Sequence, residues 1–278
     1  MNVIIGARGR LGRTIALSSH ADLVMTPPRS LYAEWWREDA VDKISQYLEK
    51  VISAPGNIYV ASGIINPCSC REEHYQANYL LPRNIIEGGT KMGFKVVTFG
   101  TVMESVISDQ TVNPYLSNKI KLGKFVRNFS EKSKLALHIR LHTLFGGGMP
   151  EEFMFLGQIL RSLIGKSEFN MTPGGQLREY HHVDDEVLAI SKILEGNESG
   201  CIELNHGAAL TLKDIAQYIF SAFSMSELLK VGKLQIPADD NFKSVFKRPD
   251  VIKDLYFRET LPALVDYLRL WTDQTRKN

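Results

Sequence analysis

A tyrosine and a lysine four positions apart are the residues whose types and spacing most directly suggest chemistry. Tyr115 and Lys119 lie in a segment that we predict to be a helix over 114–129. Residues four apart share a helix face, so both side chains can point into one pocket. There the ammonium group lowers the pKa of the phenol toward the working pH. The pair predicts a proton donor to a carbonyl oxygen or an acceptor from an alcohol, the alternative being a solvent-exposed Tyr–Lys face.

The N-terminal stretch MNVIIGARGRLGRTI predicts a phosphate-binding turn. An apolar strand over 2–5 is followed at once by three glycines and a helix-compatible segment. Gly6 allows a tight turn, Gly9 lets the backbone approach a diphosphate, and Gly12 lets the helix pack against the strand. The helix N-terminus offers free N–H groups and a partial positive charge to phosphates. This order of elements predicts a dinucleotide site.

The end of the second predicted strand, over 22–25, indicates which dinucleotide binds. An acidic residue there would hold a ribose 2′-hydroxyl, whereas a basic residue can hold a 2′-phosphate. The strand is followed by TPPRS, which contains Arg29 and no carboxylate, and Arg8 and Arg10 lie in the glycine-rich turn. The sequence therefore favours NADP(H) over NAD(H), unless these arginines only face solvent.

The elements that must position these residues alternate along the chain. Further strands are predicted over 57–61, 95–99 and 135–141, and helices over 39–52, 72–92, 114–129 and 151–164. Such alternation implies parallel strands with right-handed helical crossovers. We therefore predict an α/β fold with a Rossmann-type doubly wound parallel sheet, whose ligands lie at the carboxyl ends of the strands.

The C-terminal part predicts a smaller lobe. Asp184 and Asp185 are expected to stabilise the N-terminus of a helix, and another helix begins at Thr211. A strand is predicted over 230–237, and a closing helix over 261–271 is followed by a fraying tail.

Composition excludes several classes of protein. The 278 residues carry a formal net charge of +2 and are 44% hydrophobic, which allows a sizeable core and indicates neither a nucleic-acid nor a membrane-surface partner. Cys68, Cys70 and Cys201 form neither a disulfide framework nor two pairs of metal ligands, and His181 and His182 lack ligand spacing. We find no basic, apolar leader and no apolar run near the ~20 residues of a membrane span. These features predict a soluble, cytoplasmic protein without a metal.

Five motifs together resemble the extended short-chain dehydrogenases/reductases that act on sugar nucleotides, a group within the NAD-dependent epimerase/dehydratase family. They are the three glycines of the N-terminal turn, Tyr115-x-x-x-Lys119, Asn78 in HYQANYLLPRNIIEG, RLHTLFGGG from Arg140, and REYHHVDD from Arg178 to Asp185. The resemblance covers nearly the whole chain. Within that family it is closest to the 4-keto reductases of bacterial surface-polysaccharide deoxysugar pathways.

The resemblance implies the catalytic roles. Tyr115 is expected to donate or accept the proton, and Lys119 also to hold the nicotinamide ribose. A Ser or Thr after the preceding strand is expected to bond the reacting oxygen. Thr101 is the first candidate for that residue, Ser105 the second and Thr98 the third.

It also implies binding residues. Cofactor contacts are expected from Gly6, Arg8, Gly9, Arg10, Leu11, Gly12, Arg29, Ala61, Ser62, Gly63, Asn78 and Lys119. Substrate contacts are expected from Thr101, His142, Thr143 and Arg178. The planar guanidinium of Arg178 suits a diphosphate. Thr143 stands where many relatives carry an asparagine, and His142 either faces the sugar or simply packs.

The activity implied is NADPH-dependent reduction of the 4-keto group of a nucleotide-activated 6-deoxy sugar, a deoxyhexose or deoxyheptose, in bacterial polysaccharide or O-antigen biosynthesis. Glu104 is the only acid near the Thr101 turn, and no Asp–Glu pair follows it as would suit a 4,6-dehydratase. The alternatives are an epimerase or dehydratase with bound NAD, and a non-catalytic NADP-binding regulator.

The resemblance further implies two domains and a homodimer. Residues 1–145, with 175–200 returning, are expected to bind NADP, and 146–174 with 201–278 to form the substrate-binding lobe. Two helices of each subunit, including 114–129, are expected to form the dimer interface.

Overall fold

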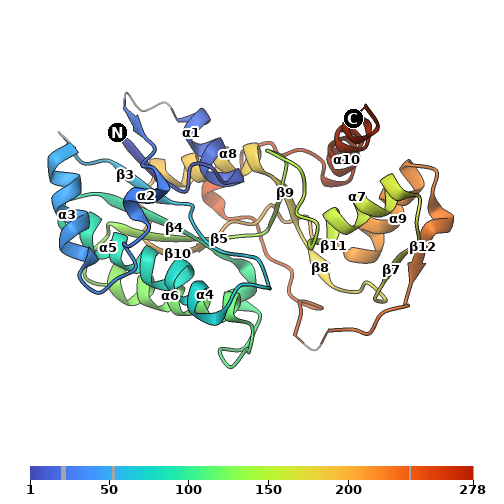
Figure 1. Ribbon diagram of the computed structural model, residues 1–278, viewed down its shortest axis with the longest axis horizontal. Helices are drawn as coiled ribbons and strands as arrows, with labels where there is room; N and C mark the ends of the chain where they lie inside the picture. The colour runs from blue at the N-terminus through green and yellow to red at the C-terminus, as the bar shows by residue number, and fades with distance from the viewer. Residues whose placement is uncertain (20–22, 52–53, 238, 278) are drawn as a thin grey trace. The chain divides into compact units, whose positions relative to one another are not determined.

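The computed structural model describes residues 1–19, 23–51, 54–237 and 239–277, and it contains two compact units (Figure 1). Unit 1 comprises Met1–Leu141 and Ala189–Leu204, and unit 2 comprises His142–Leu188 and Asn205–Asn278. The segment that returns to unit 1 is thus 189–204, whereas the sequence predicted 175–200. The boundary differs because 180–182 pair with 143–145 in a separate small sheet of unit 2.

Six parallel strands form the sheet of unit 1. In spatial order they are β10 (Gly200–Glu203), β5 (Ala136–Leu141), β4 (Lys95–Thr101), β3 (Asn57–Val60), β1 (Asn2–Ile5) and β2 (Val24–Met25). Ile4, Ile58 and Leu137 in three of these strands are at most 1% exposed. Strands covered by helices on both faces have continuous apolar sequences, which explains why the short Val- and Ile-rich runs identified them. The predicted Rossmann-type sheet is confirmed, and β10 is an additional strand.

Helices connect these strands. In Figure 1, α3 (Ala40–Val51), α5 (Leu81–Lys91) and α6 (Pro114–Ser130) lie on one face of the sheet and α1 (Arg10–Ser18) lies on the other. A short helix, α2 (Arg29–Tyr32), follows β2. Ile44 and Leu48 of α3 are one turn apart and pack into the same apolar cluster as Ile85 and Leu122. The helical periodicity of the sequence therefore marked the faces that bury against the sheet.

The helix predicted over 72–92 spans Arg71–Lys91 and contains a π-helical turn. Regular α4 (Arg71–Tyr75) leads into a π segment, Gln76–Leu80, which continues as α5. A single π turn inside an α-helix often occurs at a functional site, because it reorients the residue at its centre. That residue is Asn78, which is completely buried.

Strand β4 is longer than the predicted strand over 95–99. Gly100 and Thr101 continue its ladder by pairing with Arg140 and Leu141 of β5. Thr101 also caps a 3₁₀ turn, Val102–Ser105. This residue is therefore held by a strand on one side and a turn on the other, and not by a free loop.

Unit 2 is built from short strands and helices. Its strand pairs are β6 (Thr143–Phe145) with β9 (Tyr180–His182), β7 (Phe169–Met171) with β12 (Leu229–Val231), and β8 (Leu177–Arg178) with β11 (Leu210–Thr211). Its helices are α7 (Phe155–Gly165), α9 (Leu212–Ala222), α10 (Thr260–Lys277) and the first part of α8 (Val183–Glu195), with 3₁₀ turns at Ser226–Leu228 and Asp250–Ile252. Two predictions are confirmed: the Oγ1 of Thr211 accepts the N–H of Asp214 to cap α9, and Asp184 and Asp185 lie in the first turn of α8.

Three predicted elements of unit 2 have different bounds. The helix predicted over 151–164 begins at Phe155, after a turn in which the N–H of Met154 donates to the carbonyl oxygen of Glu151 at 2.9 Å. The strand predicted over 230–237 is limited to 229–231, since its partner β7 has three residues. The closing helix does not fray after 271, and Thr272 remains buried at 3% exposure.

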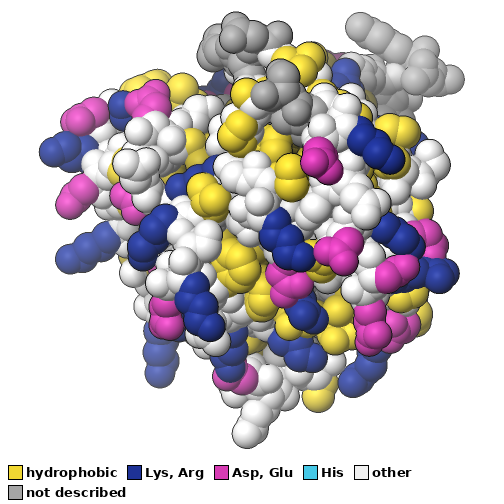
Figure 2. Space-filling view, turned by 90° about the vertical axis from the view of Figure 1, so that its left-hand side faces the viewer, with side chains coloured by type: hydrophobic (Ala, Val, Ile, Leu, Met, Phe, Trp, Pro, Cys, Tyr) yellow, Lys and Arg dark blue, Asp and Glu magenta, His cyan; other side chains and the backbone are white. Residues whose placement is uncertain are grey.

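The surface of unit 1 carries both signs of charge. Figure 2 views the molecule from the side of α3 and shows Lys and Arg side chains interspersed with Asp and Glu. None of the described helices combines the length and apolar character that a membrane span requires.

Candidate active site

The N-terminal turn has the shape of a phosphate cradle. Gly6 adopts a φ of +89°, and a Cβ there would lie 2.6 Å from the amide nitrogen of Ser62. A Cβ on Gly12 would lie 2.4 Å from the carbonyl oxygen of Gly6, so α1 packs directly on the turn. Helix α1 begins after Gly9 without a side-chain cap and without an acidic residue in its first turn. The partial positive charge at the start of the helix therefore suits an anion.

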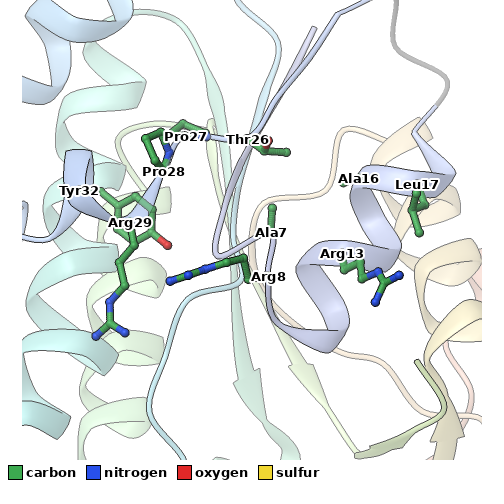
Figure 3. Close-up of a pocket in the computed structure, with 10 residues that line it drawn as sticks. All are labelled: Ala7, Arg8, Arg13, Ala16, Leu17, Thr26, Pro27, Pro28, Arg29 and Tyr32. Carbon is green, nitrogen blue, oxygen red and sulfur yellow. The ribbon is translucent and has the colours of Figure 1, made fainter. Parts of the chain in front are cut away.

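A pocket of about 350 Å³ lies beside this turn (Figure 3). Its described lining includes Arg8 of the turn, Arg13 of α1 and Arg29 at the start of α2, but no carboxylate. In Figure 3 the guanidinium groups of Arg8 and Arg29 lie on the same side of the pocket. Because the three arginine side chains are exposed, their guanidinium groups can bind a phosphate in the pocket. The cradle has the shape that the diphosphate of a dinucleotide requires, and the pocket beside it is lined by basic side chains.

The segment after β3 meets the π turn and α6. Asn78 holds the backbone of Ile64, because its Oδ1 accepts the N–H at 3.0 Å and its Nδ2 donates to the carbonyl oxygen at 2.8 Å. A Cβ on Gly63 would lie 2.8 Å from Asn78 Oδ1 and 3.8 Å from Lys119 Nζ. The expected cofactor residues Gly63, Asn78 and Lys119 are thus brought together.

Lys119 and Tyr115 lie on one face of α6, as their spacing predicted. The Nζ of Lys119 donates to the carbonyl oxygen of Phe99 in β4 at 2.7 Å and lies 5.9 Å from the centre of the Tyr115 ring. Helix α6 starts at the capping residue Asn113, whose Oδ1 accepts the N–H of Tyr115 at 3.0 Å. The cap therefore holds the backbone of Tyr115, and the bond to β4 holds the side chain of Lys119.

The pKa values of this pair correct the prediction of a lowered tyrosine pKa. Desolvation raises the pKa of Tyr115 above its ordinary value, and the carboxylate of Glu104 raises it further. Desolvation lowers the pKa of Lys119 to about 8, against the opposing effect of Glu104. The sequence suggested the effect of the ammonium group but not the effects of burial and of a third charge. In this arrangement the phenol is protonated at neutral pH and can act as a donor.

Of the three hydroxyl residues considered for the active site, Thr101 has the most suitable position. It ends β4, and helix α6 packs against both β4 and the turn that follows. Thr98 is completely buried, with its Oγ1 2.8 Å from His138 Nδ1. The Oγ of Ser105 accepts from Arg140 at 2.7 Å and donates to Glu203. These contacts leave Thr101 as the first candidate.

Of the substrate residues expected from the resemblance, Thr101 ends β4 in unit 1, whereas His142, Thr143 and Arg178 lie in unit 2. The guanidinium of Arg178 donates to Asp240 and to the carbonyl oxygen of Leu177. Thr143 begins β6, paired with Tyr180 of β9. His142 has a side chain only 5% exposed, and its Nε2 lies 2.8 Å from Asn205 Oδ1. His142 is therefore packed, and substrate contacts from all four residues stay predictions.

Sequence reasoning missed a buried cluster of histidine and glutamate in unit 2. The ring nitrogens of His181 lie 3.0 Å from Glu186 Oε2 and 3.0 Å from Glu179 Oε2. The ring of His206 stacks on that of His181 with centres 3.5 Å apart, and the ring centre of His142 lies 4.9 Å from that of His181. The HH pair after Tyr180 was visible in the sequence, but nothing in it showed which distant residues it meets.

This cluster contains donor atoms of the kind that metals take. Two groups, His142–Glu179–His181 and His181–Glu186–His206, have ligand atoms within 4.8 Å of one another. However, both nitrogens of His181 are engaged by carboxylates, and the planes of His181 and His206 are only 6° apart. The in-plane lone pairs of two stacked parallel rings lie in separate parallel planes, so they do not converge on one tetrahedral ion. The observed arrangement is a hydrogen-bonded network around an imidazolium.

The network predicts a pH-dependent stability. Desolvation lowers the pKa of His181, but the carboxylates of Glu186 and Glu179 outweigh this effect and raise the pKa to about 9. Because the folded pKa exceeds the unfolded value, this stabilisation is complete below about pH 6.5 and is lost as the pH rises through about 9. We expect the free energy of unfolding to fall by on the order of 3 kcal/mol across that range. Urea unfolding at both pH values measures it.

A matched pair of variants isolates the source of that change. His181→Asn should abolish this part of the pH dependence, whereas His182→Asn, at the neighbouring and more exposed position, should keep it. Equal pH dependence in the two variants would contradict the assignment to His181.

A model of the NAD dependent epimerase/dehydratase family matches residues 3–204. No curated protein matches the sequence. Because the match covers the six strands of the sheet, the π turn and α6, it includes every element of unit 1 that positions the proposed site.

Solved structures share the fold across almost the whole chain. A UDP-N-acetylglucosamine 4-epimerase from Methanobrevibacter ruminantium M1 is 14% identical, with a TM-score of 0.76 and 98% of each chain covered. A dTDP-glucose 4,6-dehydratase from Streptomyces venezuelae, with NAD bound, is 15% identical, with a TM-score of 0.77, covering 100% of this chain and 98% of that one. A dTDP-4-dehydrorhamnose reductase from Bacillus anthracis str. Ames, in complex with NADP, is 16% identical, with a TM-score of 0.72 and 97% of each chain covered. At these identities the likeness concerns the fold, and the family match over residues 3–204 carries the assignment: this chain belongs to the NAD dependent epimerase/dehydratase family.

Proposed function

We propose that the protein is an NADP(H)-dependent reductase that converts the 4-keto group of a nucleotide-activated 6-deoxy sugar, a deoxyhexose or deoxyheptose, to an alcohol. The observation that carries the proposal is the placement of a desolvated Tyr115–Lys119 pair on a helix that packs against the carboxyl end of β4 and Thr101. A role in bacterial polysaccharide or O-antigen biosynthesis in the cytoplasm is part of the proposal.

Each residue of the site has a distinct task in this reaction. When bound, the reduced nicotinamide supplies a hydride to the keto carbon. Tyr115 gives its proton to the carbonyl oxygen as negative charge develops there. The hydroxyl of Thr101 donates a hydrogen bond to the same oxygen, and the ammonium group of Lys119 stabilises the developing charge. The raised pKa of Tyr115 suits this direction, because the reduction starts from a protonated phenol.

The arginine-lined pocket supports NADP(H) as the cofactor. Because Arg8 and Arg29 lie on the same side of the pocket (Figure 3), a 2′-phosphate between them could accept from two guanidinium groups. The glycine cradle supports the diphosphate in either dinucleotide. The choice between NADP and NAD therefore depends on the pocket rather than on the cradle.

This choice gives a prediction for binding. Arg8→Ala and Arg29→Ala should each raise the dissociation constant for NADPH about tenfold, since each removes a charged hydrogen bond, and should leave that for NADH nearly unchanged. Titration of intrinsic fluorescence with both dinucleotides measures the constants. As a control, Lys43→Ala removes an exposed lysine that pairs with Asp39 on α3 and should change neither constant. Parallel weakening of NADPH and NADH would refute the phosphate assignment.

An epimerase or dehydratase with tightly held NAD is the second candidate. It is favoured by the overall similarity of the epimerase and dehydratase structures, whose TM-scores are 0.76 and 0.77. One feature argues against a dehydratase. A dehydratase would need an Asp–Glu pair after Thr101 as its acid and base, but Val102 and Met103 occupy these positions. An epimerase would retain its cofactor through purification and would not consume NADPH. A non-catalytic regulator would bind NADP without turnover.

A substrate screen tests the proposal. Thermal shift with GDP-, CDP-, UDP- and dTDP-sugars should identify the nucleotide, and NADPH oxidation should then follow addition of the matching 4-keto sugar. A homodimer through α6 and a second helix is also part of the proposal, and a monomeric mass at working concentration would exclude it.

A further inference from the structure

A buried carboxylate lies directly behind the proposed reacting residues. The side chain of Glu104, in the 3₁₀ turn after Thr101, has no exposed surface. Its Oε1 accepts the N–H of Thr101 at 2.8 Å, which forms a capping box with the bond from Met103 N–H to Thr101 Oγ1. The carboxylate therefore holds the backbone of Thr101, and the Met103 N–H of the same turn holds the hydroxyl oxygen.

Two glycines make room for that carboxylate. A Cβ on Gly100 of β4 would lie 2.0 Å from Glu104 Oε1, and a Cβ on Gly123 of α6 would lie 2.7 Å from Oε2. Gly123 follows Lys119 by one turn of the same helix. The strand that ends at Thr101 and the helix that carries Lys119 thus both pass against the Glu104 carboxylate without an intervening side chain.

The charges around Glu104 come from every element packed on it. His138 and Arg140 of β5 lie at 3.2 Å, the first at both carboxylate oxygens and the second at Oε2. Arg140 also reaches Glu203 of β10 at 3.3 Å. From α6, Lys119 and Tyr115 both interact electrostatically with Glu104.

Stability alone is a poor explanation for such a group. A buried carboxylate loses several kcal/mol of hydration, and replacing a buried ion pair with well-packed apolar residues is often neutral or stabilising. Desolvation raises the pKa of Glu104, but His138, the Thr101 amide and Arg140 outweigh it, so the group remains ionised. A permanent buried anion beside titrating groups is typical of functional sites.

We propose that Glu104 is a positioning residue of the reductase site: it fixes Thr101 at the end of β4 and places a buried negative charge against α6, the helix that carries Tyr115 and Lys119. The inference rests on the proposed function and assigns a role to a residue outside the Tyr–Lys–Thr set. The carboxylate acts on the substrate only through these neighbours.

Glu104→Gln separates charge from position. Glutamine keeps an oxygen that can accept the Thr101 N–H, but the anion is removed, so the pKa of Lys119 should fall by about one unit from its value near 8. Labelled lysine ε-carbons, observed by NMR and assigned with Lys119→Arg, report this pKa without turnover. In the enzyme assay, the alkaline limb of kcat should move to lower pH by the same amount, while KM for NADPH stays constant.

A matched control removes a carboxylate from the outer end of the same network. Glu203→Gln should leave both the Lys119 titration and the pH profile unchanged, because Glu203 bonds Arg140 and Ser105 at the outer end of the network, whereas Glu104 bonds the Thr101 N–H. If Glu104→Gln does not fold, Arg140→Gln provides the opposite test. It removes a positive charge that pairs with Glu104, so the negative charge of Glu104 should act more strongly on Lys119 and raise its pKa.

The outcomes distinguish the two proposals. An unchanged Lys119 titration in Glu104→Gln, or a shift to higher pH, overturns the role of Glu104 even if the enzyme is a reductase. The expected shift, together with no NADPH oxidation on any 4-keto sugar, supports the electrostatic role and overturns the reductase.

Discussion

Replacing Tyr115 by phenylalanine is expected to lower kcat about a thousandfold, because a positioned general acid contributes on the order of 10² to 10⁴ to a proton-transfer step. Phenylalanine keeps the ring that lies 5.9 Å from Lys119 Nζ but lacks the hydroxyl. The dissociation constant for NADPH should therefore stay within a factor of about two. Steady-state oxidation of NADPH and equilibrium binding measure the two quantities.

The chain offers a second Tyr–Lys contact as a control. Lys121 Nζ lies 5.0 Å from the centre of the Tyr75 ring, which stacks on Tyr79. Tyr75→Phe removes a hydroxyl from a comparable contact that is not part of the proposed site, and it should leave kcat unchanged. Equal loss of activity in the Tyr75 and Tyr115 variants, or none in either, would contradict the role of Tyr115.

Gly12→Val is expected to weaken dinucleotide binding roughly a hundredfold. The added Cβ would lie 2.4 Å from the carbonyl oxygen of Gly6 and 2.9 Å from its carbonyl carbon, so the turn must move away from α1. Forcing atoms into a packed site costs on the order of 3 kcal/mol, which corresponds to that loss of affinity. Calorimetric titration with NADPH measures it.

A second glycine variant separates this local effect from a general loss of stability. Gly165→Ala at the end of α7 places its Cβ 3.7 Å from Ser167 Oγ, which is an ordinary contact, and should bind NADPH like the unchanged protein. Normal affinity in Gly12→Val would show that the turn does not hold the diphosphate.

The parts of the fold that the sequence predicted are those set by local pattern. Apolar runs such as 2–5 and 57–60 are buried on both faces of a parallel sheet, so their strand character is visible in composition alone. The glycine turn was recognisable because each glycine has its own steric role: a tight turn at Gly6, close approach of the backbone at Gly9 and packing of the helix at Gly12. The Tyr115–Lys119 pair followed from helical periodicity.

The parts that the sequence did not predict depend on contacts between distant residues. Strand β4 extends to Thr101 because its partner β5 continues to Leu141, a pairing that no local pattern reveals. Likewise, the raised pKa of Tyr115 reflects desolvation and Glu104, which the packing of β4 against α6 brings into range. The buried cluster around His181 joins segments from 142 to 206 in the chain. Polar residues in such networks have no periodicity to identify them.

The central claim, hydride transfer to the keto carbon with proton donation by Tyr115, is tested most directly by isotopic labelling. The protein should be incubated with NADPH deuterated at the nicotinamide C4 and with the nucleotide-linked 4-keto-6-deoxy sugar selected by the thermal-shift screen. The account predicts one deuterium at C4 of the sugar product and one NADP⁺ formed for each product molecule, with both lost in Tyr115→Phe. Conversion of a sugar nucleotide without deuterium in the product and without oxidation of NADPH would contradict it.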